Sequence, residues 1–142
     1  EILAIFQGPQ AYVRPSWYAT KQETGKVVPT WNYAVVHATG PLRIVRDVQW
    51  LRALVERLTD EHEGTRPDPW HVSDAPDAYV ERMVKGIVGF EIPIERLLGK
   101  WKMSQNRMES DRRGVIAGLG SSDSAADRAV ADAVHAAGRR AD

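Results

Sequence analysis

The stretch TWNYAVVHATGPLRIV, residues 30–45, indicates the fold class. Its first nine residues alternate in the manner of a strand. One face would carry Trp31, Tyr33, Val35 and His37, and the other Asn32, Ala34, Val36 and Ala38. Gly40-Pro41 is a tight connection, after which residues 42–45 are expected to form a strand paired back on the first.

The residues upstream of this stretch also favour β-structure. Residues 2–6 and 11–13 form apolar runs separated by Gly8-Pro9, and residues 16–18 after Pro15 are expected to form a turn or short helix. Because the chain opens abruptly on a strand, we expect further N-terminal strands of the same domain to lie upstream of it.

Downstream, the pattern changes to helices. Asp47 is a candidate N-cap for a helix ending near His62, and its apolar residues recur at helical spacing. These residues are Val48, Leu51, Leu54, Val55 and Leu58. A second helix is predicted over residues 76–85, followed by a half-buried strand over residues 90–94. Residues 106–109 have the spacing of a capping box for a further helix that stops at residues 118–120.

The last part of the chain differs in composition. Residues 120–142 are rich in Ser, Asp, Ala and Arg, so we expect a disordered or weakly helical tail in which Val130 and Val134 would line the helix. Residues 1–119 would then form one domain. Its class is mainly β (α+β): an antiparallel sheet or barrel with helices to one side.

Composition excludes several classes of function. The 142 residues carry 19 Lys and Arg against 19 Asp and Glu, which disfavours a binder that blankets nucleic-acid phosphates. The absence of cysteine excludes thiolate chemistry and disulfides. The four histidines lack ligand spacing, so no metal site is predicted. No apolar run is long enough for a membrane helix, no phosphate-binding loop is present, and no catalytic residue can be named.

Two clusters of side chains suit a planar, anionic ligand. The first combines residues 16–18 with Lys26 and with Trp31, Asn32 and Tyr33, which together offer rings and hydrogen-bonding groups. Packing in a barrel core explains its aromatic residues equally well.

The second cluster, KWKMSQNR at residues 100–107, interleaves cations with Trp101 and amides, and Arg suits bidentate contact with phosphate. A solvated basic edge and a weak single-strand nucleic-acid surface are the alternatives.

The ordered set of motifs resembles the PaiB family. The matching segments are FQGP (6–9), Tyr12, PSWY (15–18), VPTWNY (28–33), VH (36–37), SDAP (73–76), IVG (87–89), EIP (91–93), KWK (100–102), SQNR (104–107), DR (111–112) and GVIAGL (114–119). The resemblance covers residues 1–119 and leaves the tail outside.

This resemblance implies a cytoplasmic, homodimeric FMN-binding split β-barrel with inserted and C-terminal helices, acting as a negative transcriptional regulator. DNA is a further candidate partner, with weak support from the sequence, and a membrane is not. The alternative function is a flavin-dependent oxidoreductase related to pyridoxamine-phosphate oxidase or flavin reductases. The residues expected around the flavin are Lys26, Trp31, Asn32, Tyr33, Trp101, Gln105 and Arg107.

Overall fold

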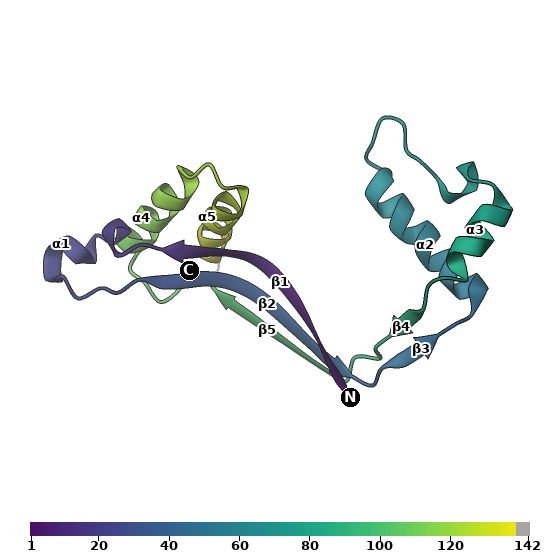
Figure 1. Cartoon of the computed structure of the whole chain (residues 1–142). Helices are drawn as coiled ribbons and strands as arrows, with labels where there is room; N and C mark the ends of the chain where they lie inside the picture. The colour runs from purple at the N-terminus through teal and green to yellow at the C-terminus, as the bar shows by residue number, and fades with distance from the viewer. Residues whose placement is uncertain (139–142) are drawn as a thin grey trace. The chain divides into compact units, whose positions relative to one another are not determined.

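The structure is a computed structural model that describes residues 1–138 (Figure 1). The chain divides into two compact units. The sheet unit comprises residues 3–38 and 95–138, and the insertion unit comprises residues 39–94 with Glu1–Ile2. Helices account for 44% of residues and strands for 26%, so the α+β class is confirmed and helix is its larger part.

The sheet unit is built on three strands in the order β1-β2-β5. Strand β1 spans Ile2–Val13, β2 spans Thr30–Gly40 and β5 spans Arg96–Lys102. The two apolar runs expected at the start form one continuous strand, because Pro9 is tolerated on an edge strand. Gly8 has a packing reason: a Cβ there would lie 3.0 Å from the Cβ of Ala34 in β2.

Strand β5 corrects the expected course of the chain between residues 90 and 109. The strand predicted over residues 90–94 is reduced to β4, Gly89–Glu91, and the longer strand follows it at β5. The predicted capping box at residues 106–109 is not formed, because α4 spans Glu109–Gly120 and its N-cap, Met108, makes no side-chain cap bond. The sequence did not predict β5 as a strand, because it contains Gly99 and two lysines, which are residue types uncommon in strands.

Helices pack against the sheet through one hydrophobic core. After β1 come a 3-10 turn, Pro15–Trp17, and α1, Thr20–Thr24, while α4 and α5, Ala125–Gly138, follow β5 (Figure 1). The buried core consists of Ala11, Val13, Tyr18, Ala34, Met103, Val115, Leu119, Val130, Ala131 and Val134. Residues 125–138 of the tail form α5, on which Val130 and Val134 are buried. Residues 139–142 lie outside the described part.

The insertion unit contains a two-stranded ribbon and two main helices. Strand β3, Arg43–Val45, pairs antiparallel with β4, with Ile44 opposite Phe90. The expected pairing of residues 42–45 back onto β2 is therefore wrong. Val48–Glu63 form α2, Val72–Asp74 a 3-10 turn and Asp77–Val84 α3, as the periodicity predicts for both helices.

The predicted N-cap of α2 is confirmed, because the Asp47 side chain accepts a hydrogen bond of 2.7 Å from the Trp50 amide. The core of this unit is small and consists of Leu51, Val72, Val80 and Val84. Val48 and Leu58, which the helical spacing placed on the inner face of α2, are 40% and 47% exposed.

Trp17 packs closely against two glycines of α4. A Cβ at Gly114 would lie 1.9 Å from the Trp17 carbonyl oxygen, and one at Gly118 would lie 2.3 Å from the indole ring. The GVIAGL segment therefore serves packing, because its glycines let the 3-10 turn approach the α4 backbone.

A Gly118→Ala substitution is expected to destabilise the protein by about 1–3 kcal/mol, the usual cost of overpacking. Alanine favours a helix over glycine by up to about 1 kcal/mol, which is too little to offset the clash with Trp17. Urea unfolding followed by circular dichroism measures the change. Gly120→Ala is the matched control, since a Cβ there meets nothing within 4 Å. Equal effects of both substitutions would contradict the packing role.

Candidate functional site

The turn that follows β5 is fixed by its own hydrogen bonds. The Gln105 side chain accepts from the Met103 amide at 2.7 Å and donates to the Trp101 carbonyl at 2.8 Å. The Arg107 amide donates to the Ser104 carbonyl at 3.0 Å. Ser104 has φ = 58°, a left-handed conformation that is uncommon for a residue other than glycine. Such backbone geometry persists only where its surroundings hold it, and it clusters at binding sites.

Strand β2 holds this turn from the other side. The Asn32 amide donates to the Ser104 hydroxyl at 2.9 Å, and that hydroxyl lies 3.3 Å from the Asn32 carbonyl oxygen. Asn32 is 1% exposed and Ser104 is 6% exposed. The pair links residues 72 positions apart in the chain, so β2 and the turn form one rigid wall.

Two cations stand beside this wall. The Lys102 ammonium donates to the Thr30 hydroxyl, and the Arg107 guanidinium lies 4.6 Å from the centre of the Tyr18 ring. Together these elements enclose a cavity of about 70 Å³ lined by Tyr18, Thr30, Asn32, Lys102, Ser104, Asn106 and Arg107. We call it the Tyr18 cavity.

A buried carboxylate fixes the segment that carries Tyr18. Asp111 on α4 is 2% exposed, and its two oxygens accept from the Thr20 amide and the Thr20 hydroxyl, each at 2.9 Å. This contact joins α4 to the start of α1 at Thr20, which lies two residues after Tyr18. Asp111 therefore sets the position of the Tyr18 ring under Arg107.

The Tyr18 hydroxyl is buried and has no hydrogen-bond partner among residues 1–138. Burial raises the pKa of Tyr18 above its ordinary value of 10.0, with Arg107 opposing the shift and Asp111 adding to it. Because the folded protein retains the phenolic proton longer than the unfolded chain, stability is fully present below pH 10 and falls as the pH rises further.

A Tyr18→Phe substitution is expected to remove this alkaline loss of stability. In a titration followed by tyrosinate absorbance, the substitution should also remove the component that ionises above the ordinary range. Tyr79→Phe, in the insertion unit and exposed, is the control. Loss of an ordinary component in the Tyr18→Phe titration would contradict the buried state of this phenol.

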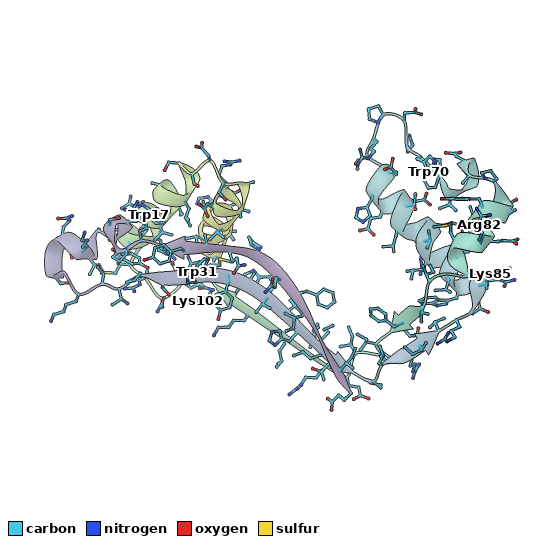
Figure 2. The ribbon with its side chains drawn as sticks, viewed as in Figure 1. Trp17, Trp31, Trp70, Arg82, Lys85 and Lys102 are labelled. Atoms are coloured by element: carbon cyan, nitrogen blue, oxygen red, sulfur yellow. The ribbon has the colours of Figure 1, made fainter. Side chains whose placement is uncertain are left out.

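The structure brings together only part of the predicted set of ligand-binding residues. Asn32 and Arg107 meet at the Tyr18 cavity. Trp31 alternates with Asn32 along β2, is 52% exposed and packs edge-on against Tyr12 at 6.0 Å (Figure 2). Tyr33 lines a different hollow, of about 200 Å³, with Gln7, Gly8, Gln10, Ala34 and Val35.

The remaining predicted residues lie outside the cavity as well. Lys26 is exposed in the loop between α1 and β2, and the Trp101 side chain is exposed on β5. The Gln105 side chain is engaged within its own turn. The predicted set did not include five residues of the cavity lining, although all of them except Thr30 belong to the two clusters: Tyr18, Thr30, Lys102, Ser104 and Asn106. Their residue types and their positions within the clusters could be recognised in the sequence. Their contacts with residues far away in the chain could not.

The described part of the chain, residues 1–138, contains neither a metal-binding cluster nor a membrane-spanning helix. No group of three or more His, Asp or Glu side chains there is placed to hold a metal ion. None of the helices in this part of the chain has the length and apolar character needed to cross a membrane.

A family model described as "Putative FMN-binding domain" matches residues 1–96, which is more than half of the chain. The chain belongs to this FMN-binding family. A Bacillus subtilis relative named "Protease synthase and sporulation protein PAI 2" is 37% identical over 82% of the chain, so the resemblance to the PaiB family is confirmed. FMN is accordingly the cofactor of the family, as expected from the sequence.

Fungal proteins also belong among the relatives of this FMN-binding chain. An uncharacterized protein of Emericella nidulans is 43% identical over the whole chain, and one of Aspergillus fumigatus is 44% identical over 84% of it. The chain spans 61% and 52% of these two proteins and 53% of the Bacillus subtilis protein.

The donor groups of the Tyr18 cavity fit FMN chemically. Lys102 and Arg107 offer charge to an anionic group, and the side chains of Ser104 and Asn106 offer hydrogen bonds to oxygen or nitrogen. The cavity is nevertheless small, since sites for drug-sized ligands measure about 300–1,000 Å³. It accommodates one part of a flavin nucleotide and not the whole molecule.

Proposed function

We propose that this chain forms half of an FMN site in a homodimeric split β-barrel protein that regulates transcription. The observation that carries the proposal is the Tyr18 cavity, which pairs a cationic, carboxylate-free lining with a volume too small for a complete flavin nucleotide. A surface from a second copy would supply the rest of the site.

The exposed side chains of the sheet support a second copy. Leu97 and Trp101, which share one face of β5, are 61% and 56% exposed, and Trp31 on the neighbouring strand β2 is exposed as well. Contiguous apolar surface of this kind marks interaction sites in soluble proteins. In the dimer, these side chains would be covered by the partner.

Within this arrangement the residues of the chain bind and orient the ligand. Lys102 and Arg107 would attract its anionic part, and the Asn32–Ser104 pair would hold the turn in its binding geometry. Bound FMN supplies hydride and electron transfer, while the protein determines its position and electrostatic environment.

Flavin binding and dimerisation can be tested in one preparation. The purified chain is mixed with FMN, desalted and examined by visible absorption and by light scattering coupled to size exclusion. We expect about one FMN per subunit and a dimeric mass. A Trp31→Asp, Leu97→Asp double variant should become monomeric and lose FMN together. Tight FMN binding by a monomer would contradict the shared site.

The regulatory role has a separate test against the oxidoreductase alternative. Salt-sensitive binding of the FMN-loaded dimer to promoter DNA, with the linear dependence on salt that phosphate contacts produce, would support the regulator. Steady oxidation of reduced nicotinamide by the same preparation, without DNA binding, would support a flavin-dependent oxidoreductase instead.

A further inference from the structure

The lining of the Tyr18 cavity consists of hydrogen-bond donors without a carboxylate. Its seven side chains are two cations, two amides, two aliphatic hydroxyls and one phenol. Neither Lys102 nor Arg107 forms an ion pair with a carboxylate of residues 1–138. Cations enclosed with neutral donors attract an anion, because no carboxylate of residues 1–138 is paired with either of them.

The Tyr18 hydroxyl is an independent indication of a ligand. It is a buried donor without a partner in the described chain, although Tyr18 as a whole is only 2% exposed. A buried polar group that makes no hydrogen bond costs free energy, so such groups are rare and need an explanation. An acceptor oxygen in the adjoining cavity would satisfy the hydroxyl.

The shape of the cavity is fixed before any ligand arrives. Asn32 holds the Ser104 hydroxyl, Gln105 closes the turn, and Asp111 anchors the segment of Tyr18 through Thr20. Donors fixed in this way bind an anion without paying the entropy of ordering loops and rotamers. The volume of the cavity, about 70 Å³, exceeds the roughly 30 Å³ that one water molecule takes up in the liquid, and it suits a single small group.

The charge of the sheet unit favours the same kind of ligand. In the sequence, the described ranges of this unit, 3–38 and 95–138, contain 10 Lys and Arg against seven Asp and Glu. The neutral total of the chain thus conceals a basic excess in the unit that contains the cavity. Such an excess steers anions toward the unit.

We propose that the Tyr18 cavity is a subsite for a single phosphate group, in which Lys102, Arg107 and the Tyr18 hydroxyl contact the phosphate oxygens. The group is either the phosphate of FMN itself or that of a separate phosphorylated small molecule bound beside the flavin. The first source relies on the FMN-binding function proposed above, whereas the subsite itself does not.

Inorganic phosphate is the probe for the subsite. Its dissociation constant for the whole chain is measured by ³¹P NMR titration for the wild-type protein and for Lys102→Gln, Arg107→Gln and Tyr18→Phe. We expect at least a tenfold weakening for each lysine or arginine variant, and a severalfold weakening for Tyr18→Phe, which removes one oxygen and keeps the ring under Arg107. Lys21→Gln, an exposed cation of α1, is the matched control and should bind as the wild type does.

Folding of each variant is checked by circular dichroism. Should a glutamine variant fail to fold, Lys102→Arg and Arg107→Lys keep the charge and are expected to retain phosphate within a few fold, while Tyr18→Phe still tests the site. No phosphate binding by the wild type, or equal binding by Tyr18→Phe, the cation variants and Lys21→Gln, would overturn the subsite.

A second arm distinguishes the two sources of the phosphate. If FMN fills the subsite, inorganic phosphate should compete with FMN and not with riboflavin. Lys102→Gln should then weaken the binding of FMN and leave the binding of riboflavin unchanged. If a separate molecule fills it, phosphate and FMN should bind together. Phosphate binding without any flavin binding would reject the proposed FMN function and retain the subsite, and flavin binding without phosphate binding would do the reverse.

Discussion

Deleting residues 125–142 is expected to abolish the cooperative folding of the sheet unit. Helix α5 contributes Val130, Ala131 and Val134 to the core, and all three are 4% exposed or less. Each buried valine stabilises the fold by about 1.5–3 kcal/mol, and the deletion also uncovers Val115 and Leu119 on α4. The total approaches the 5–15 kcal/mol by which a typical domain is stable.

Urea unfolding of the truncated chain, followed by circular dichroism, measures this effect. Val134→Ala should lower the stability of the full chain by roughly 1–2 kcal/mol, less than the 2–5 kcal/mol of a larger side chain. Asp132→Ala, on the exposed face of the same helix, should stay within about 0.5 kcal/mol of the wild type. A truncated chain that unfolds at the wild-type urea midpoint would show that α5 is dispensable.

Asp111→Ala is expected to destabilise the protein by about 2–4 kcal/mol. Hydrogen bonds to a charged group contribute about 1.5–3 kcal/mol each, and both carboxylate oxygens of Asp111 accept from Thr20. Removing the cost of burying the charge offsets part of this loss. The free energy of unfolding from urea titrations is the measurement.

The same substitution should also weaken phosphate binding, because the Tyr18 segment loses its anchor on α4. Thr20→Val is a milder companion, since it removes the hydroxyl contact and keeps the amide contact. Its loss of stability should therefore be smaller than that of Asp111→Ala. A larger loss for Thr20→Val would show that the amide contact contributes little.

Local signals predicted the elements that depend on local physics. The N-cap at Asp47, the helical spacing after it and the alternation of β2 all describe contacts within a few residues. All three match the structure except that Val48 and Leu58 of the helix are exposed. Pairing between strands was not encoded locally. Residues 43–45 pair with β4, which lies more than 40 residues downstream, and neighbouring residues carry no record of that choice.

Helix α5 was difficult to predict for a related reason. Its alanines and small valines give little hydrophobic signal, yet α4 offers a complementary surface with Val115 and Leu119. The burial of a weakly apolar helix depends on its partner, and propensity within the segment cannot show that partner.

The candidate site followed the same division. Residue types identified Asn32 and Arg107 because amides and guanidinium groups suit a phosphorylated ligand, and the structure places both at the Tyr18 cavity. Trp31 and Asn32 lie on opposite faces of β2, as the alternation in the sequence predicts. The approach of Tyr18 to the turn after β5 depends on the contact of Asp111 with Thr20, 91 residues apart, and was beyond sequence reasoning.

The wedge of Trp17 between Gly114 and Gly118 also gives the molecule an optical signal of its own. Trp17 packs against the core of the sheet unit and Trp50 against that of the insertion unit. Trp31, Trp70 and Trp101 are exposed, and Figure 2 labels Trp17, Trp31 and Trp70. With the three exposed indoles replaced by phenylalanine, fluorescence from the remaining pair would follow each core. Removing Trp17 or Trp50 in turn would then report whether the two units melt together or in succession.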